Sequence, residues 1–366
     1  MTNHVAGVNI QVTAQDPIPE KPVEAVKPVV KPIETPKLDS NYSKCAGLDI
    51  GTMNIISSRQ NGPNVEYKRI RDVFIDLTKD QVKMLKLSGE TSYITKDDIC
   101  YVLGDDAATI ANIFGRQLRN PLTKGVISPG ELEAMSVLSV MVGEVLGKSP
   151  EGGICVVSSP GDPVDSDFDV IFHQAVITDI VSNYGWNVTT ASESTALAYA
   201  ECADNDFSGL CLSFGAGMTN ISLVFKTIEA LKFSVSRGGN WIDSQTAKSC
   251  GKLPSQICAI KEKGLDLLNP VGREQSALVI FYKHLIGYAI YHFIQNFRKL
   301  QGNIEIPKEI PCIIAGGTSL PKNFINLVKN EINKNNGFPF PISEVKLASD
   351  PLNSISRGLL ILSQNS

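Results

Sequence analysis

Two short turns that contain glycine, about 160 residues apart, hold residue types that can bind phosphate. The first spans residues 48–54 (LDIGTMN) and the second spans residues 212–220 (LSFGAGMTN). Each is followed by an apolar run, which predicts that each turn joins two strands of a β-hairpin with its backbone N–H groups pointing outward. Two such hairpins facing each other would hold a phosphate chain from both sides, without the lysine that a P-loop uses.

The first turn also carries a carboxylate, because Asp49 lies two residues before Gly51. A bare carboxylate would repel phosphate, so we expect Asp49 to hold Mg²⁺ through water. A tight turn with a capping acid accounts for the same residues, and this short motif does not by itself separate the two interpretations. The second turn has glycines where a backbone must approach a ligand closely, and it carries Ser213 at the position that corresponds to Asp49.

A third candidate is Glu193, which lies between a predicted strand and an alanine-rich predicted helix. Its carboxylate could orient a water for attack on a γ-phosphate, or it could simply stabilise the positive end of the helix dipole. Two glycine pairs also follow strand-like runs. Gly238 and Gly239 suit the close passage of a sugar or an adenine, and a flat base could lie on the backbone of Gly316 and Gly317. Each pair is equally compatible with an ordinary loop.

The elements that position these residues begin after an arm of different composition. Residues 1–43 hold six prolines between positions 17 and 36, interleaved with Lys, Glu and Val, which predicts an extended arm that cannot bury a core. This arm is either a spacer or a docking segment for a protein partner. From residue 44 onward the pattern alternates strand and helix, which predicts an α/β chain with mixed sheets.

The two glycine hairpins each open one half of the chain, which predicts two similar lobes around a cleft that binds a ligand. We place lobe I at residues 44–210, with residues 340–366 returning to it, and lobe II at residues 211–339. Apolar residues at helical spacing predict a helix over residues 167–184. Its buried side is expected to consist of Phe168, Ile171, Phe172, Ala175, Ile180 and Val181.

Composition argues against several classes of function. The 366 residues carry a net charge of −4 and are 43% hydrophobic and 20% charged, which is typical of a globular chain and gives no sign of a nucleic-acid surface. The eight cysteines are scattered singly and form no CxxC pair, so neither a zinc site nor a redox motif is expected. The N-terminus has no signal-peptide pattern, and we expect a cytoplasmic protein with reduced thiols.

The order and spacing of the motifs carry more information than any one of them. In chain order they are DxGTxN (49–54), ExxAxA (193–198), GxGxTN (215–220), GGxxxD (238–243) and GGTS (316–319). Together they resemble the ATPase superfamily of actin, heat-shock chaperones and sugar kinases over residues 47–360. Within it the chain is most similar to bacterial actins of the MreB and MamK kind. The segments that carry this similarity are LGDDA (103–107), NPL with GVI (120–127) and DPL with RG (350–358).

This resemblance implies an actin-like ATPase fold of four subdomains, with ATP and Mg²⁺ bound between the two lobes. By position, Asp49 would organise Mg²⁺ through water and Glu193 would position the hydrolytic water. The other matched residues would bind the nucleotide. Its phosphates would contact Gly51, Thr52, Asn54, Gly215, Ala216, Gly217, Met218 and Thr219; its ribose Gly238, Gly239 and Asp243; and its adenine Gly316, Gly317, Thr318 and Ser319.

The chain departs from the family pattern at Ser213, where relatives usually have Asp, and at Lys124, where the related segment also has Asp. The acid that Ser213 replaces helps to hold the metal-bound water. Its loss removes one electrostatic contribution to the transition state, which can cost roughly 10²–10³ in rate. We therefore expect a protein that binds ATP and hydrolyses it slowly.

The resemblance also implies self-association into a head-to-tail filament with a cytoskeletal role in cell organisation, positioning or segregation. One alternative is an actin-fold ATP-binding adaptor that forms no filament and recruits division, pilus or other assembly machinery. Another is a small-molecule kinase, although no acidic residue clearly presents a substrate hydroxyl. No direct nucleic-acid contact is expected. Membrane contact stays open, because the proline-rich arm cannot supply the amphipathic helix that such contact often uses.

Overall fold

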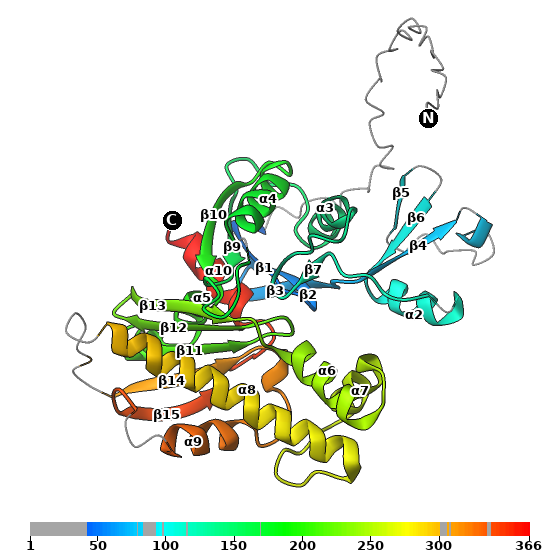
Figure 1. Cartoon of the computed structure of the whole chain (residues 1–366). Helices are drawn as coiled ribbons and strands as arrows, with labels where there is room; N and C mark the ends of the chain where they lie inside the picture. Colours follow the sequence, from blue (N-terminus) through cyan, green and yellow to red (C-terminus); the bar gives the residue numbers. More distant parts are fainter. Residues whose placement is uncertain are drawn as a thin grey trace, which may run out of the picture.

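The structure is a computed structural model that describes residues 42–366, apart from residues 79, 83–92, 97–98, 115, 169, 301–305, 307–308 and 335–337. The proline-rich arm expected over residues 1–43 lies outside the described residues, except for residues 42 and 43 at the start of the first strand. The described chain forms two lobes, each built on a five-stranded mixed sheet (Figure 1).

The sheet of lobe I has the strand order β10-β9-β1-β2-β3. Strands β1 (Tyr42–Ile50), β2 (Asn54–Asn61) and β3 (Asn64–Arg71) form an antiparallel meander, whereas β9 (Ile154–Ser159) and β10 (Asn187–Ser192) continue the sheet in parallel. Side chains on both faces of β9 are buried, which explains its continuous apolar run. The glycine turn predicted near residue 51 is the turn between β1 and β2.

The sheet of lobe II repeats this arrangement with the strand order β13-β12-β11-β14-β15. Strands β11 (Gly209–Phe214), β12 (Thr219–Phe225) and β13 (Ile228–Val235) form the meander, and β14 (Ile310–Ala315) and β15 (Ile342–Leu347) are parallel to β11. The second glycine turn joins β11 to β12. The predicted internal repeat is therefore confirmed as two sheets of the same topology.

Strand β15 corrects one predicted lobe boundary. It pairs with β14 at the edge of the lobe II sheet, so residues 342–347 do not return to lobe I as a return at residue 340 would require. The crossing is made by the last helix, α10 (Ser354–Gln364), which packs on β1 and β9 of lobe I and on α5 (Glu193–Glu201). Because α5 also contacts β11 and β12, these two helices lie between the two sheets.

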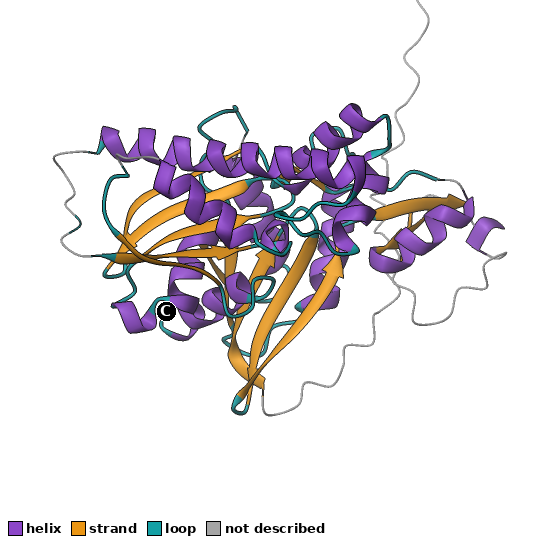
Figure 2. Ribbon diagram, turned by 90° about the horizontal axis from the view of Figure 1, so that it is seen from below, coloured by secondary structure: helices purple, strands orange, loops and turns teal. Residues whose placement is uncertain are grey.

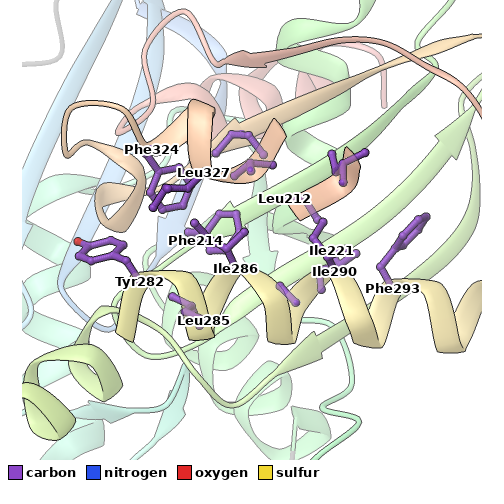
Figure 3. Packing of buried hydrophobic residues seen from close by; sticks show 14 of the residues in the cluster. Leu212, Phe214, Ile221, Tyr282, Leu285, Ile286, Ile290, Phe293, Phe324 and Leu327 are labelled. Carbon is purple, nitrogen blue, oxygen red and sulfur yellow. The ribbon is translucent and has the colours of Figure 1, made fainter. Parts of the chain in front are cut away.

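The hydrophobic core of lobe II lies between its sheet and α8 (Gly272–Lys299). Figure 3 shows Ile290 of this helix beside Ile221 of the sheet, and Ile286 beside Phe214. By length and composition α8 could cross a membrane, but half of its most apolar window is buried within the fold, as in the core helix of a globular protein. Three further helices, α6 (Gly239–Cys250), α7 (Pro254–Glu262) and α9 (Phe324–Lys334), contact α8. Figure 2 shows helices in a layer along the sheet of lobe II.

Smaller elements extend lobe I. An antiparallel sheet and α2 (Gly104–Phe114) share a small core of their own. A two-strand hairpin then leads to α3 (Ala134–Val145) and α4 (Val170–Ser182). The strands of the small sheet are β4 (Phe74–Thr78), β6 (Ile99–Leu103) and β5 (Tyr93–Lys96), and those of the hairpin are β7 (Leu122–Thr123) and β8 (Val126–Ile127).

The helix α4 forms where it was predicted, but its predicted buried side is partly wrong. Ile171 and Phe172 were expected to be buried, and they are 79% and 50% exposed. The buried side consists instead of Val170, His173, Ile177, Ile180 and Val181. His173 is a polar residue on this buried face. A prediction based on the spacing of apolar side chains therefore did not identify the face correctly.

Candidate functional site

The two glycine turns face each other across a cavity of about 830 Å³ between the lobes. They have the same local geometry: Gly51 N–H donates to Asn54 O at 3.0 Å, and Gly215 N–H donates to Met218 O at 3.0 Å. Each hydrogen bond closes a tight turn at the end of a hairpin. The cavity wall holds most of the predicted site residues, namely Asp49, Gly51, Thr52, Asn54, Glu193, Gly215, Ala216, Gly217, Met218, Gly239, Gly316, Gly317 and Thr318.

The backbones of the lobes approach very closely at Gly217. A Cβ at this position would collide with Thr52 Oγ1, and it would lie 2.7 Å from the backbone nitrogen of Gly125 in the turn between β7 and β8. Gly125 N–H itself donates to Thr52 Oγ1 at 2.9 Å. Glycine is therefore required at position 217 by sterics, because only a residue without a side chain lets the second turn meet the first.

The other glycine segments converge on the same place. Gly316 has φ +91°, a left-handed conformation that favours glycine, and a Cβ there would meet the backbone of Phe214. Thr318 Oγ1 donates to Gly215 O at 2.8 Å, and Gly239 N–H donates to the same oxygen at 3.0 Å. The second glycine turn is thus held from behind by the start of α6 and by the short helix η2 (Gly317–Ser319).

Four predicted residues do not line the cavity and instead support its wall. Thr219 Oγ1 donates to the backbone of residue 237 at 2.8 Å, and Ser319 Oγ donates to the backbone of residue 316 at 2.7 Å. Gly238 lies against the backbone of the second turn, where a Cβ would come within 2.6 Å of residue 216 O. Asp243 is buried and paired with Lys261 Nζ at 2.7 Å.

Two carboxylates, that of the buried Asp49 and that of the half-buried Glu193, share the cavity wall. Burial raises the pKa of Asp49, and one of its oxygens, Oδ1, is buried without a hydrogen-bond partner. Burial also raises the pKa of Glu193, and the negative charge of Asp49 raises it further; hydrogen bonds from Asn220 and Ser213 oppose that rise. Two acids so placed attract a cation, and the unpartnered oxygen of Asp49 is chemically suited to a metal-bound water.

Several charged residues of the wall were missed by the sequence analysis. Lys261 and Glu262 come from the end of α7, and Arg71 comes from the end of β3. Arg71 and Glu262 belong to opposite lobes, and their closest side-chain atoms, Nη2 and Oε1, lie 3.7 Å apart. These residues belong to no glycine motif, so only the fold brings them together. Arg69, Asp266 and Lys322 were missed in the same way, and Asp105 lies in the LGDDA segment but was not predicted to be at the site.

Two repeated α/β lobes around a cavity walled by glycine turns define an actin-like fold. The chain belongs to the Volactin family, whose model matches residues 45–363. No curated protein matches the chain.

Solved structures with this fold include a MamK double helical filament. It has a TM-score of 0.67 and 18% sequence identity, and the match covers 87% of this chain and 98% of that one. MreB5 of Spiroplasma citri bound to ADP has a TM-score of 0.59 and 16% identity, with 87% and 96% covered. The ethanolamine utilization protein EutJ from Carboxydothermus hydrogenoformans has a TM-score of 0.51 and 16% identity, with 89% and 92% covered. The predicted similarity to bacterial actins of the MreB and MamK kind is therefore confirmed at the level of the fold.

Proposed function

We propose that the cavity between the lobes binds ATP together with Mg²⁺. The observation that carries this proposal is the pair of equivalent turns, at Gly51 and Gly215, that face one cavity from opposite lobes. Backbone N–H groups that converge from two sides suit a chain of phosphates, and a side chain as large as Ala would not fit at Gly217. MreB5 of Spiroplasma citri, which shares the fold, has been solved with ADP and with AMPPNP.

Mg²⁺ would neutralise charge on the phosphates. Asp49 would hold it through water, because the unpartnered Oδ1 of that residue lies in the cavity wall. Glu193 would orient the attacking water, and its raised pKa makes it a stronger base than a solvent-exposed carboxylate. Ser213 lies beside Glu193, with its Oγ 3.4 Å from Glu193 Oε2, so it supplies a weak donor where an acid would add charge. Slow hydrolysis follows from that difference.

Binding is tested by titrating the full chain with a fluorescent ATP analogue and Mg²⁺. Gly217→Val places a branched side chain against Thr52 and the turn at Gly125, so we expect affinity to fall at least about 10-fold. Gly130→Val is the matched control, because a Cβ at Gly130 meets no other atom within 4 Å. Equal affinities for wild type and Gly217→Val, or no binding by wild type at all, would contradict the proposal.

We further propose that the nucleotide-bound chain assembles head to tail into a cytoplasmic filament. The support is the likeness to a MamK double helical filament, which extends over 87% of this chain. Electron microscopy and sedimentation with ATP and Mg²⁺ test this directly. Filaments that appear with ATP and are lost in Gly217→Val support a nucleotide-dependent polymer. A wild-type chain that binds ATP and stays a monomer or a dimer supports the alternative of an ATP-binding adaptor.

A further inference from the structure

Asn220 connects the carboxylate of Glu193 to the loop between β9 and α4, a loop of lobe I that lies against lobe II. It is the second residue of β12, directly after the turn of that hairpin, and it is almost fully buried. Its Nδ2 donates to Glu193 Oε2 at 2.9 Å, and its Oδ1 accepts Gly161 N–H at 2.9 Å. Both ends of the amide are therefore used, and each contacts a residue of lobe I.

The orientation of this amide is fixed by chemistry. Gly161 N–H can only donate, so the atom that faces it must be the oxygen, and the nitrogen must then face Glu193. Gly161 is also held from its other side, since Ser234 Oγ donates to Gly161 O at 2.7 Å. Ser234 is the cross-strand neighbour of Asn220 between β12 and β13. The two side chains together clamp both polar groups of Gly161.

The loop that contains Gly161 is anchored along lobe II. Ser234 N–H donates to Asp162 O at 2.9 Å, and Val164 N–H donates to Ser234 O at 3.0 Å. Asp165 then accepts hydrogen bonds from the backbone N–H of residue 236 and from the Tyr288 hydroxyl. The position of Asn220 is therefore set by a loop from lobe I and a strand from lobe II at the same time.

We infer that Asn220 is the positioning residue for Glu193, which it holds by Oε2 so that Oε1 stays directed to the attacking water. Within the described part of the chain the donors to this carboxylate, Asn220 and Ser213, both reach Oε2. Asn220 is the stronger of the two by distance, at 2.9 Å against 3.4 Å. The catalytic half of this inference depends on the proposed ATP site, whereas the contact between Asn220 and Glu193 does not.

The contact can be measured on the protein without nucleotide. The negative charge of Asp49 on β1 raises the pKa of Glu193. The hydrogen bond from Asn220 lowers that pKa, because it favours the charged form of Glu193. Asn220→Ala therefore raises the pKa of Glu193 further. When folding raises the pKa of a carboxyl group, the folded protein loses stability as the pH rises from the ordinary pKa of that group, about 4.3, toward the raised pKa. We expect the drop in Tm caused by Asn220→Ala to be about 2 °C larger at pH 9 than at pH 5.

In a Glu193→Gln background the same substitution should lower Tm by an amount that does not depend on pH. Asn220→Ser serves as the second variant if Asn220→Ala does not fold. Ser234→Ala is the control, because it weakens the grip on Gly161 without removing a donor from Glu193, and its drop in Tm should be the same at all pH values. A pH-independent effect of Asn220→Ala in the wild-type background would overturn the inference.

With Mg²⁺ and ATP, Asn220→Ala should lower the single-turnover hydrolysis rate about 10- to 100-fold while the Kd for ATP stays within about two-fold of wild type. The acidic limb of its pH–rate profile should move up by about one pH unit. The substitution should have no further effect in Glu193→Gln. Equal losses in rate and affinity, or wild-type ATP binding without any hydrolysis, would overturn the inference. Wild-type protein that binds no ATP would overturn the proposed function instead, and the Tm experiment would still decide the contact.

Discussion

At the scale of single residues, Ser213 sets how much negative charge the cavity wall carries. Ser213 is 1% exposed and lies beside Glu193, and both share the cavity wall with Asp49, whose charge raises the pKa of Glu193. An acid at this position would bring a third carboxylate into a buried site. Such a cluster costs stability when no cation is present, and it strengthens the binding and activation of a metal-bound water when one is.

Ser213→Asp should therefore raise the Mg²⁺-dependent hydrolysis rate by about 10-fold or more. Without Mg²⁺ it should lower Tm, and the loss should grow as pH rises above about 4, because the added charge raises the pKa of Glu193 and Asp49 further. Phosphate release and thermal unfolding at several pH values, each with and without Mg²⁺, check both expectations. Ser213→Asn is the control, since it matches the size of Asp and adds no charge. A rate that falls or stays constant in Ser213→Asp would refute this role.

The residues that sequence analysis found at the site share one property: they lie in short motifs whose spacing is set by a single turn. Gly51 and Gly217 are examples, and both line the cavity. Asn220 was part of one motif, but its role depends on Gly161, a contact that spans 59 positions. Lys261 reaches the cavity from α7 and pairs with a buried acid. A contact of this kind depends on how helices are placed, and no local pattern encodes it.

At the scale of elements, the fit of α10 between the lobes depends on close backbone contact. Gly358 lies in α10, and a Cβ there would overlap Ala196 O in α5. On another side of α10, Gly47 of β1 would collide through a Cβ with the backbone of Ser356 and Leu360. Helix, strand and helix therefore approach one another without side chains between them, in the region that joins the two sheets.

Gly358→Ala should lower the free energy of unfolding by about 3 kcal/mol or more, because the atom that it would strike is a backbone oxygen that cannot move aside. Gly287→Ala, within α8, is the matched control. Its Cβ would first meet Glu331 Oε1 at 3.4 Å, and alanine favours a helix over glycine by up to about 1 kcal/mol. Urea unfolding followed by circular dichroism compares the two. If Gly358→Ala unfolds at the wild-type urea concentration, α10 does not pack against α5 in this way.

Whether a segment forms a helix or a strand was largely predictable from the sequence. Which side of a helix is buried was not always predicted correctly. The alternation of strand and helix after residue 44 and both glycine hairpins were predicted and are present, whereas β15 was not predicted. In α4 the exposed Ile171 and Phe172 were mistaken for core residues, because an apolar side chain on the surface has the same sequence signal as one in the core. The buried His173 carried the opposite signal.

At the scale of the whole molecule, the repeat of two lobes was readable from the paired glycine turns. The path of the chain between the lobes was not, because β15 joins the lobe II sheet by pairing with β14 and only then does α10 cross back. Which strand β15 pairs with depends on which sheet edge is free where this part of the chain lies in the folded protein. Short motifs contain no information about that edge, so the boundary predicted at residue 340 was placed too early.

The same two-lobed arrangement places an ion pair between the lobes in the wall of the cavity, and this pair leads to a prediction about nucleotide release. Arg71 of lobe I and Glu262 of lobe II lie 3.7 Å apart, with side chains 31% and 54% exposed. Pairs this exposed contribute only about 0.2–1 kcal/mol. Breaking the pair should leave the fold intact and ease the separation of the lobes. We expect Arg71→Glu to speed the release of a bound fluorescent ADP analogue about two- to five-fold at low salt, with little change at 1 M salt.

The double variant Arg71→Glu/Glu262→Arg restores opposite charges between the lobes and should return the release rate toward the wild-type value. Asp105 is the control, because its carboxylate lies 4.0 Å from Arg71 but on the same lobe. Asp105→Asn removes a neighbour of Arg71 without touching the contact between the lobes, so it should leave the release rate unchanged. Stopped-flow measurements on all four proteins separate a latch between lobes from a general effect of charge. If the double variant releases nucleotide as fast as Arg71→Glu alone, the pair does not restrain the cleft.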